Sequence, residues 1–474
     1  MKRSTALLAT CLASCFAATT APAADLLAVY QRALQNDPQL KEAEATRLAA
    51  LEAKPQAVAA LLPQLNGTGT AQRERDTGPT NETQVVTAGP ATTGGTGAAA
   101  ATQTFSYPFS GTTTTTTYQY GLNLKLNLFS WQNWVALKRA DAQLAQAEAD
   151  YQAAQQDLMS RVAQAYFDVL SAEDDLDAQQ GALASVNRQL EQAEARYQAG
   201  LIAITDVEEA RASHDSSVAA VIDAKRQLAT TNEQLREIIG DSFDSLARPT
   251  EPFELANPEP LSEDRWVDMA LQQNLSLVSS RLAADIAREN VSAAESGHLP
   301  TLDLVGTQSK NKVNANSVYN DGTPYGGETV DQTDRTIGLQ LTIPIYSGGL
   351  VSSQVRQAVY LHRAAKERLE RVARQTERDT RDAYLGVLSE ISRVKALKRA
   401  VDSNTTALKA TESGYEAGTR TAVDVLESRR LWIQAQTNYS RSRYDYLINV
   451  LKLQQAAGIL SEQSLTSVNR WLAR

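Results

Sequence analysis

The sequence contains very little cysteine: among its 474 residues there are two, Cys11 and Cys15, and both lie within the first 23 residues. This stretch has the pattern of a secretory signal, with a basic start, an apolar segment over residues 6–18 and a small-residue site at residues 21–23. Cleavage after residue 23 leaves a mature chain without a thiol, which excludes disulfides and thiolate metal sites. One alternative stays open, because residues 12–15 resemble a lipobox in which Cys15 is lipidated instead.

An excess of positive charge and long apolar runs are also missing. The formal net charge is −9, and loss of Lys2 and Arg3 with the signal makes it −11 (−9 − 2). Nucleic-acid binding needs a basic face, so that class is excluded. No run of 18 apolar residues follows the signal, so the sequence predicts no transmembrane helix. An exported chain of this kind is periplasmic, released, or inserted into an outer membrane through strands of alternating polarity.

Residue patterns that carry catalysis are sparse. The three histidines, His214, His298 and His362, lack metal-ligand spacing. P-loop, nucleophile-elbow and dinucleotide-binding motifs are absent from the sequence. We therefore expect no enzyme activity, no cofactor and no metal site.

An internal duplication is the strongest feature that the sequence does have. The segment YQAGLIAITDVEEAR, residues 197–211, matches YEAGTRTAVDVLESR, residues 415–429, at a distance of 218 residues (415 − 197). Other matched segments begin at Ala33 and Ala270, Leu62 and Leu299, Gly121 and Gly338, and Ala165 and Ala383. The sequence therefore predicts a first repeat over residues 24–248, a Pro-rich linker over 249–260, a second repeat over 261–457 and a C-terminal segment over 458–474.

Each repeat is expected to contain a helix, a β-hairpin and a long helical hairpin, in that order. The β-hairpins are placed at about residues 62–129 and 299–346, because apolar and polar residues alternate over 118–128 and 337–345. We expect one face of these strands to contact lipid and the other to face a lumen; the lipid-facing residues are Tyr118, Leu122, Leu126, Leu339 and Leu341, and the lumen-facing residues are Asn123 and Lys125. A Gly/Thr/Ala-rich stretch at about residues 77–117 predicts a long flexible loop, with residues 313–334 as its shorter counterpart.

The helical hairpins are expected at about residues 130–240 and 347–457. The absence of proline, together with heptad spacing, predicts one long helix from Trp131 to Ala199. Its counterpart from Leu350 to Ala417 keeps some residues at a spacing of seven but is less regular. Gly200 and Gly418 follow these helices at the position that favours a left-handed residue. Thr205 and Glu208 have the spacing of a capping box, which predicts the start of the returning helix. The repeated motif is therefore predicted to be the tip of a helical hairpin, at the opposite end of an elongated molecule from the strand hairpins.

Four strands per chain are too few to close a barrel in a membrane, where ~8 is the smallest number found. An open sheet edge in lipid leaves unpaired backbone groups at a cost of several kcal/mol each. Membrane-spanning strands must therefore be pooled between chains. A trimeric coiled-coil surface adhesin or structural protein is the alternative; it accounts for the heptads and the signal, but not for two separate strand hairpins.

The order of elements and five segments resemble the TolC family of outer-membrane efflux and type I secretion channels over nearly the whole mature chain. The segments are ALQNDP, LLPQL, RYQAGLIAITDVEEARA, GYEAGTRTAVDVLE and YDYLINVLKLQQAAGILSE. The resemblance implies a mixed α and β membrane protein, in which a homotrimer forms a twelve-stranded β-barrel continuous with a long α-helical coiled-coil barrel. It also implies a location in the cell outer membrane with a long periplasmic extension.

The function implied by the resemblance is the passive exit duct of a tripartite efflux pump or type I secretion system, opened at its periplasmic tip by partner proteins. The implied partners are a periplasmic adaptor (membrane fusion) protein, an inner-membrane transporter and outer-membrane lipid, with no nucleic acid. Neither the transported substrates nor the class of transporter follows from the sequence.

Three sets of residues acquire roles from the same resemblance. The gate residues, which are expected to bond between the two tips, are Thr205, Asp206, Tyr415 and Arg420. The acidic pair, expected to form a cation-favouring constriction, is Asp424 and Glu427. The tip contact residues, expected to meet the adaptor, are Gly200, Leu201, Gly418 and Thr419.

Overall fold

The computed structural model describes residues 23–87, 102–243, 245–249 and 255–472. The predicted signal covers residues 1–23, and all of it except residue 23 lies outside the described range. The chain divides into two compact units. The helical unit comprises the described parts of Met1–Ala50, Ala145–Ala284 and Ala365–Arg474, and the sheet unit comprises those of Leu51–Leu144 and Asp285–Ala364.

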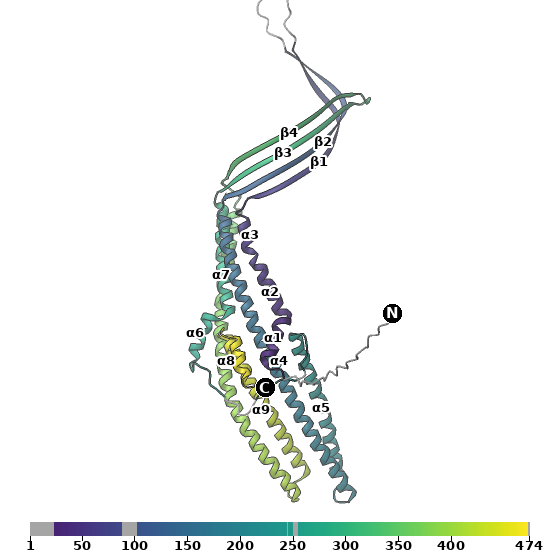
Figure 1. Cartoon of the computed structure of the whole chain (residues 1–474), viewed down its shortest axis with the longest axis vertical. Coiled ribbons are helices and arrows are strands. Elements are labelled where there is room, and N and C mark those ends of the chain that lie inside the picture. The colour runs from purple at the N-terminus through teal and green to yellow at the C-terminus, as the bar shows by residue number, and fades with distance from the viewer. Residues whose placement is uncertain (1–22, 88–101, 244, 250–254, 473–474) are drawn as a thin grey trace, which may run out of the picture. The chain divides into compact units, whose positions relative to one another are not determined.

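The sheet unit contains one antiparallel sheet in the order β1-β2-β3-β4 (Figure 1). Its strands are β1 (Gln64–Thr87), β2 (Thr102–Phe129), β3 (Thr301–Tyr319) and β4 (Pro324–Thr342). The register pairs Leu126 with Leu304 and Leu304 with Leu339, so apolar residues from three strands share one face. On the opposite face Lys125 Nζ lies 3.3 Å from the carboxylate of Asp303. β1 and β4 are the edge strands of this sheet.

The prediction of a long loop at about residues 77–117 is wrong over the part of it that the structure describes. β1 continues to Thr87, β2 begins at Thr102, and the six threonines over residues 112–117 pair with both β1 and β3. Threonine is β-branched and favours strands, and ladder hydrogen bonds satisfy its backbone even where neither face is apolar. The low hydrophobicity of the stretch was therefore misleading; residues 88–101 lie outside the described range.

The second hairpin also differs from the prediction at both ends. Its predicted loop over residues 313–334 is strand except for the short connection between Tyr319 and Pro324. The sheet ends at Thr342, paired with Thr301, so the alternating residues Ile343 and Ile345 lie beyond it. Pro344 explains this end, because proline has no N–H to donate to a ladder.

The helices include two that are very long, α4 and α8, and each of these ends within one residue of the position expected from its heptads. No helix in the described part of the chain is both long and apolar enough to cross a membrane. The α-helices are α1 (Leu26–Asn36), α2 (Pro38–Leu51), α3 (Ala53–Ala59), α4 (Trp131–Gln198), α5 (Ile204–Ile239), α6 (Glu263–Gln273), α7 (Leu275–Glu295), α8 (Leu350–Glu416), α9 (Ala422–Ala456) and α10 (Glu462–Asn469). A 3-10 turn, Ser296–His298, precedes β3.

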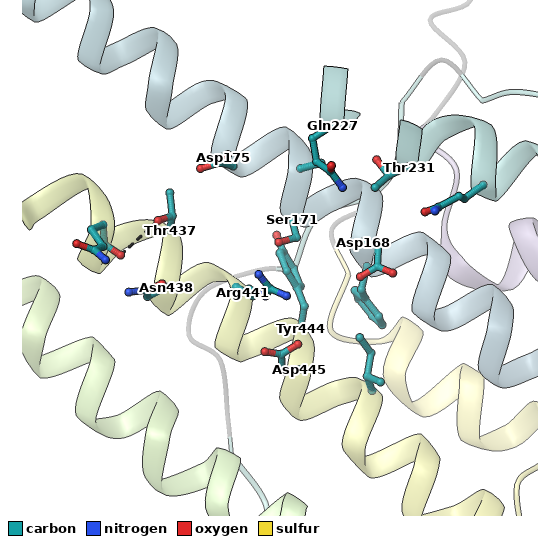
Figure 2. A pocket seen from close by; sticks show the side chains of 15 residues that line it. Asp168, Ser171, Asp175, Gln227, Thr231, Thr437, Asn438, Arg441, Tyr444 and Asp445 are labelled. Carbon is teal, nitrogen blue, oxygen red and sulfur yellow. Dashed lines mark hydrogen bonds between the residues drawn. The ribbon is translucent and has the colours of Figure 1, made fainter. Parts of the chain in front are cut away.

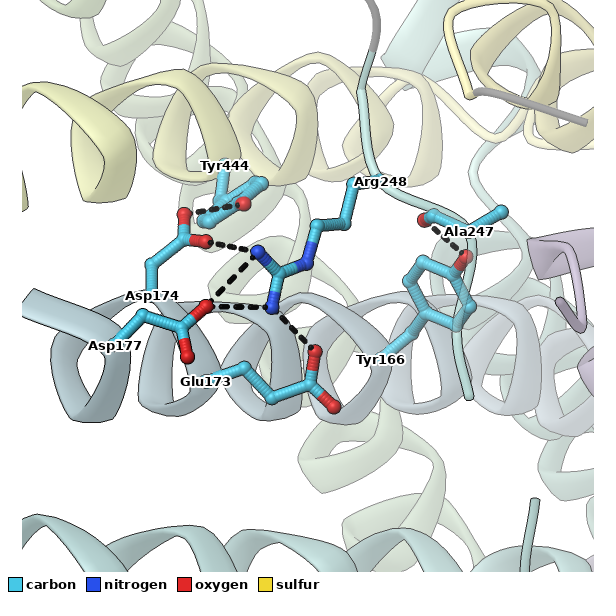
Figure 3. A network of polar contacts seen from close by, with 7 residues as sticks. All are labelled: Tyr166, Glu173, Asp174, Asp177, Ala247, Arg248 and Tyr444. Atoms are coloured by element: carbon cyan, nitrogen blue, oxygen red, sulfur yellow. Dashed lines mark hydrogen bonds and ion pairs between the residues drawn. The ribbon is translucent and has the colours of Figure 1, made fainter. Parts of the chain in front are cut away.

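The core of the helical unit surrounds three aromatic side chains, Tyr166, Phe167 and Tyr444, all of which are buried. The rings of Phe167 and Tyr444 stack with centroids 5.7 Å apart. The Tyr166 hydroxyl donates to the carbonyl of Ala247 at 2.6 Å, which ties the end of the first repeat to α4 (Figure 3). The Tyr166 hydroxyl also lies 3.2 Å from the carbonyl of Ala24 at the start of the first repeat. The duplication preserves this second contact, because the hydroxyl of Tyr384 on α8 donates to the carbonyl of Leu261, at the start of the second repeat, at 2.7 Å.

A charged cluster next to this core anchors the segment that joins the two repeats. The guanidinium of Arg248 lies within 3.4 Å of carboxylate oxygens of Glu173, Asp174 and Asp177 on α4 (Figure 3). Tyr444 of α9 donates to Asp174 at 2.7 Å. Burial, followed by the nearby Asp174 carboxylate, raises the pKa of the Tyr444 hydroxyl, so it remains a donor. The centre of the helical unit is therefore held by buried and charged contacts between several elements.

Candidate functional site

The two helical hairpins end in the same backbone motif. After α4, Gly200 has a positive φ of 71°, and the N–H groups of Gly200 and Leu201 donate back to the carbonyls of Tyr197 and Arg196. After α8, Gly418 has a φ of 76°, and Gly418 and Thr419 donate to Tyr415 and Gly414. Both patterns are Schellman motifs, in which a left-handed glycine lets the chain leave the helix.

An ion pair between the two helices of each hairpin is also duplicated. Arg211 on α5 lies 3.3 Å from Glu194 on α4, and at the equivalent positions Arg429 on α9 pairs with Glu412 on α8. The second pair is the less exposed, with 21% for the Arg429 side chain against 49% for Arg211. The two tips are therefore built on one frame, in which the second pair is better shielded from water.

The returning helices begin differently, and the predicted capping box is wrong. The N-cap of α5 is Ala203, without a side-chain cap, and Thr205 lies inside the first turn, beyond the position from which a cap acts. The capping box is instead in the second tip: the Thr421 hydroxyl accepts from the Asp424 N–H, and the Asp424 carboxylate accepts from the Thr421 N–H. A capping box is therefore present in the second repeat and not, as predicted, in the first.

The structure of one chain leaves three of the four gate residues on the surface. Thr205, Asp206 and Arg420 are exposed, and no side-chain hydrogen bond of these three occurs among the described residues. The fourth, Tyr415, is half-buried, and its hydroxyl accepts from Arg196 at 2.7 Å. Within one chain Tyr415 therefore contacts the first hairpin through Arg196, which is not one of the predicted gate residues.

Each member of the acidic pair has a partner in its own chain. Hydrogen bonds from the Thr421 N–H and hydroxyl hold the pKa of Asp424 below its ordinary value of 3.8. Arg430 donates to Glu427 at 2.6 Å and lowers the pKa of that carboxyl. Both groups are therefore ionised at neutral pH, but the charge of Glu427 is compensated by Arg430.

The tip contact residues form the exposed surface of the two turns. Leu201 is 73% exposed, and Gly200, Gly418 and Thr419 are also exposed. An added Cβ at Gly200 or at Gly418 would meet no atom within 4 Å. The turns themselves are thus open to another molecule.

A polar groove of about 560 Å³ lies between α4, α5 and α9 (Figure 2). Asp168 lines it with Asp175 and Asp445, and Arg441 is the cation among these acids. Burial raises the pKa of the Asp168 carboxyl, although a hydrogen bond from Gln164 offsets part of this effect. Pockets that hold small molecules tightly are lined mainly by apolar side chains, so this groove lacks their usual character.

Comparison with known proteins determines the family. The family model described as "Outer membrane efflux protein" matches residues 29–241 and 266–459. The chain belongs to this family. It is 37% identical over 451 residues to the outer membrane protein TolC of Vibrio cholerae, covering 95% of this chain and 94% of that protein.

Other proteins similar to this chain include a second TolC protein and a protease secretion protein. TolC of Escherichia coli is 34% identical over 456 residues, covering 95% of this chain and 86% of that protein. The alkaline protease secretion protein AprF of Pseudomonas aeruginosa is 28% identical over 343 residues, covering 72% of this chain and 69% of AprF. Among solved structures, the CmeC outer membrane channel of Campylobacter jejuni has a TM-score of 0.72 at 18% identity, covering 94% of this chain and 89% of CmeC.

These comparisons confirm the predicted TolC family, the fold class and the outer-membrane location. The chain is thus a member of a family of outer-membrane efflux channels, which are transporters. Nothing in the comparisons supports the adhesin alternative. The roles of the gate residues, the acidic pair and the tip contact residues are not tested by them and remain predictions.

Proposed function

We propose that three copies of this chain form the passive exit duct of a tripartite efflux pump or a type I secretion system. The main support is the four-stranded sheet, in which β1 and β4 are the edge strands. In addition, 95% of this chain aligns with TolC of Vibrio cholerae. Strand edges in lipid need partners, and neighbouring copies supply them. Three copies then contribute twelve strands to one closed barrel.

The distribution of apolar residues on β2 supports this placement in the membrane. Alternation over residues 118–128 is about as long as the ~9–11 residues that a tilted strand needs to cross the hydrocarbon. Tyr118 and Tyr120 occupy one end of this band and are 39% and 60% exposed, where an aromatic girdle at the interface is expected. The threonines over residues 112–117 continue the sheet beyond the band.

The apolar band can be tested by placing a charge on either face of the same strand. Leu124→Arg puts a cation in lipid at a cost of ~2–4 kcal/mol near mid-bilayer, whereas Asn123→Arg puts it in the lumen. We expect Leu124→Arg to reduce the amount of trimer recovered from outer-membrane fractions far more than Asn123→Arg does. Equal recovery of the two variants would contradict the assignment of the faces.

Closure of the duct is proposed to depend on the gate residues. Thr205 and Asp206 on the first tip and Arg420 on the second are exposed and retain hydrogen-bonding capacity, so they suit bonds that break when a partner docks. A partly exposed pair such as Arg420 with Asp206 contributes ~0.2–1 kcal/mol, and threefold symmetry repeats it. Contacts of this size hold a closed end while leaving it easy to open.

The acidic pair is proposed to form a constriction that favours cations, as rings of carboxylates do in other channels. Arg430 forms an ion pair with Glu427, whereas in the part of the chain that the structure describes Asp424 has no ion pair and feels only the charge of Arg420. The two residues should therefore not contribute equally. Asp424→Asn should weaken block of the pore by trivalent cations more than Glu427→Gln does. If the order is reversed, or if neither change alters block, the pair does not line the constriction.

The partners proposed for this duct are a periplasmic adaptor, which meets Gly200, Leu201, Gly418 and Thr419, and an inner-membrane transporter that supplies energy and selectivity. A wide passage needs no recognition site of its own, so we expect no tight substrate binding. Deleting the gene and challenging the cells with dyes, antibiotics and a secreted protein tests the function directly. Greater susceptibility or lost secretion is expected; unchanged responses in a strain without a second family member would refute the proposal.

A further inference from the structure

Arg196 joins the two helical hairpins of one chain at their tips. Its Nη1 donates to the hydroxyl of Tyr415 at 2.7 Å, and its Cζ lies 5.1 Å from the centroid of the Tyr415 ring. The guanidinium therefore makes both a hydrogen bond and a cation–π contact with the same side chain. Its backbone carbonyl accepts the N–H of Leu201, so Arg196 belongs to the Schellman motif that ends α4.

The duplication shows that this contact is specific to the first tip. The repeat equivalent of Arg196 is Gly414 (196 + 218), where an added Cβ would lie 2.8 Å from the Cγ of Arg420. A side chain at position 414 would therefore displace Arg420. Tyr197, the equivalent of Tyr415, is 45% exposed and has no side-chain hydrogen bond among the described residues. Arg196 in the first tip and Arg420 in the second therefore stand at positions that are not equivalent. Of these two, Arg196 alone bonds to the other hairpin among the residues that the structure describes.

We propose that Arg196 is a positioning residue of the gate, which holds Tyr415 and with it the second hairpin against the first hairpin of the same chain. This inference rests on the proposed exit duct, in which the tips separate when the channel opens. Arg196 keeps Tyr415 in place from within the chain, while Arg420 and Asp206 stay free to bond elsewhere. Opening then requires that the bond between Arg196 and Tyr415 breaks in each copy.

The two components of the contact can be separated by substitution. Tyr415→Phe removes the hydroxyl and keeps the ring, so it leaves the cation–π contact in place. Arg196→Ala removes both components, and Arg196→Lys keeps a charge but loses the planar group. Arg196 is exposed on a helix, where alanine is well tolerated, so these variants are expected to fold. Arg188→Ala is the matched control, because the Arg188 side chain bonds to the carbonyl of Ala184 on its own helix.

Single-channel recordings of the purified protein in planar lipid bilayers test the proposal. For each copy of the contact that is lost, Arg196→Ala should shift the open–closed equilibrium about 1.4- to 5-fold towards the open state, the shift expected when a two-state equilibrium loses one exposed contact to a charged group. Tyr415→Phe and Arg196→Lys should give smaller increases, and Arg188→Ala none. Adding Tyr415→Phe to Arg196→Ala should have no further effect, because the two residues act through one contact.

Two results separate failure of this inference from failure of the function. If Arg196→Ala behaves like the wild type while Arg420→Ser opens the pore, the inference is overturned and the exit duct stands. If the wild-type protein forms no pore, the proposed function fails and the inference with it.

Cross-linking gives a second readout that does not depend on conductance. The natural cysteines both lie in the predicted signal, so Arg196→Cys with Tyr415→Cys adds the thiols of the mature chain. A bifunctional maleimide should join them within one chain, giving a product that migrates as a monomer after denaturation, and should prevent further opening. Cross-linked dimers and trimers would show that the neighbours lie on different chains and would overturn the proposal; each single cysteine variant is the control.

Discussion

The first and second helical tips share a backbone but differ in the side chains that act on it. Both turns use a left-handed glycine, Gly200 or Gly418, and both have an arginine–glutamate pair behind the turn. The helix that follows the first tip lacks a side-chain cap, whereas the helix that follows the second tip has a capping box. Arg196 of the first tip bonds to the other hairpin, whereas Arg420 of the second tip is exposed to solvent. After duplication, the geometry of the turn was kept and the polar residues around it diverged. We infer that the shared glycine turns and arginine–glutamate pairs have a structural role, and that the polar side chains that differ between the two tips form the gate.

Replacing the turn glycines should have the largest effect, and it should be equal in the two tips. Gly200→Ala and Gly418→Ala each force a Cβ into a left-handed conformation at a cost of about 1–2 kcal/mol. Hydrogen exchange of the tip amides should accelerate correspondingly. Gly181→Ala is the control, because Gly181 lies inside α4 with open space around it, and alanine there should slow exchange. An effect confined to one tip would show that the shared frame is not equivalent.

Removing the cap of the second tip should destabilise that tip, and adding the same cap to the first tip should stabilise it. Thr421→Ala removes the capping box of α9, which should cost about 1 kcal/mol. Ala203→Thr creates the same arrangement in the first tip, because Asp206 already occupies the position that Asp424 has in the second. We expect faster amide exchange at the start of α9 in the first variant and slower exchange at the start of α5 in the second. No gain from Ala203→Thr would mean that the turns differ in more than their caps.

Loss of the arginine–glutamate pair should have a smaller effect on stability than loss of a turn glycine or of the cap, and the effect should differ between the two tips. Arg429→Ala should destabilise its hairpin by about 1 kcal/mol, and Arg211→Ala by a few tenths, because the second pair is less exposed. Added salt should reduce the effect of Arg211→Ala more than that of Arg429→Ala. Proteolysis at the two tips under native conditions compares them, and equal sensitivity of the two variants would contradict this ranking.

The smallest expected effect is a dependence on pH that is confined to the second tip. The pKa of Asp424 is lowered by the hydrogen bonds from Thr421, so its stabilisation is present above the ordinary pKa of 3.8 and is lost as the pH falls through the lower folded value. After correction for intrinsic exchange rates, protection at the start of α9 should decrease between about pH 5 and pH 3. The Thr421→Ala variant should lose this dependence; if it persists there, another group is responsible.

Much of the fold could be predicted because its signals are local and periodic. Heptads without proline located α4 and α8, a glycine marked each helix end, and alternation located β2 near the leucines. The threonine-rich strand was missed because its pairing is satisfied by β1 and β3, whose registers are not local information. The end of β4 at Thr342 was missed because alternation continues past a proline that interrupts the ladder.

The positions of the two helical tips could be predicted from the sequence, but the side-chain contacts within and between them could not. The repeat and its resemblance to a family identified both tips. The capping box was assigned to Thr205 because sequence spacing alone does not show where a helix begins. Arg196 was missed because one arginine on a polar helix gives no signal. Its only trace in the sequence is that its repeat partner is Gly414, and the meaning of that difference depends on where Tyr415 lies.

The most direct test of the account is the conductance of single trimers in planar bilayers, measured for the wild type and for the variant with both Arg420→Ser and Tyr415→Phe. Because these changes remove the two hydrogen-bonding groups that the second tip contributes to the proposed gate and leave the sheet untouched, we predict a small wild-type conductance and a several-fold larger one for the variant. A wild-type protein that forms no pore would contradict the exit duct. If the variant has the same conductance as the wild type, contacts between the two different tips do not close the channel.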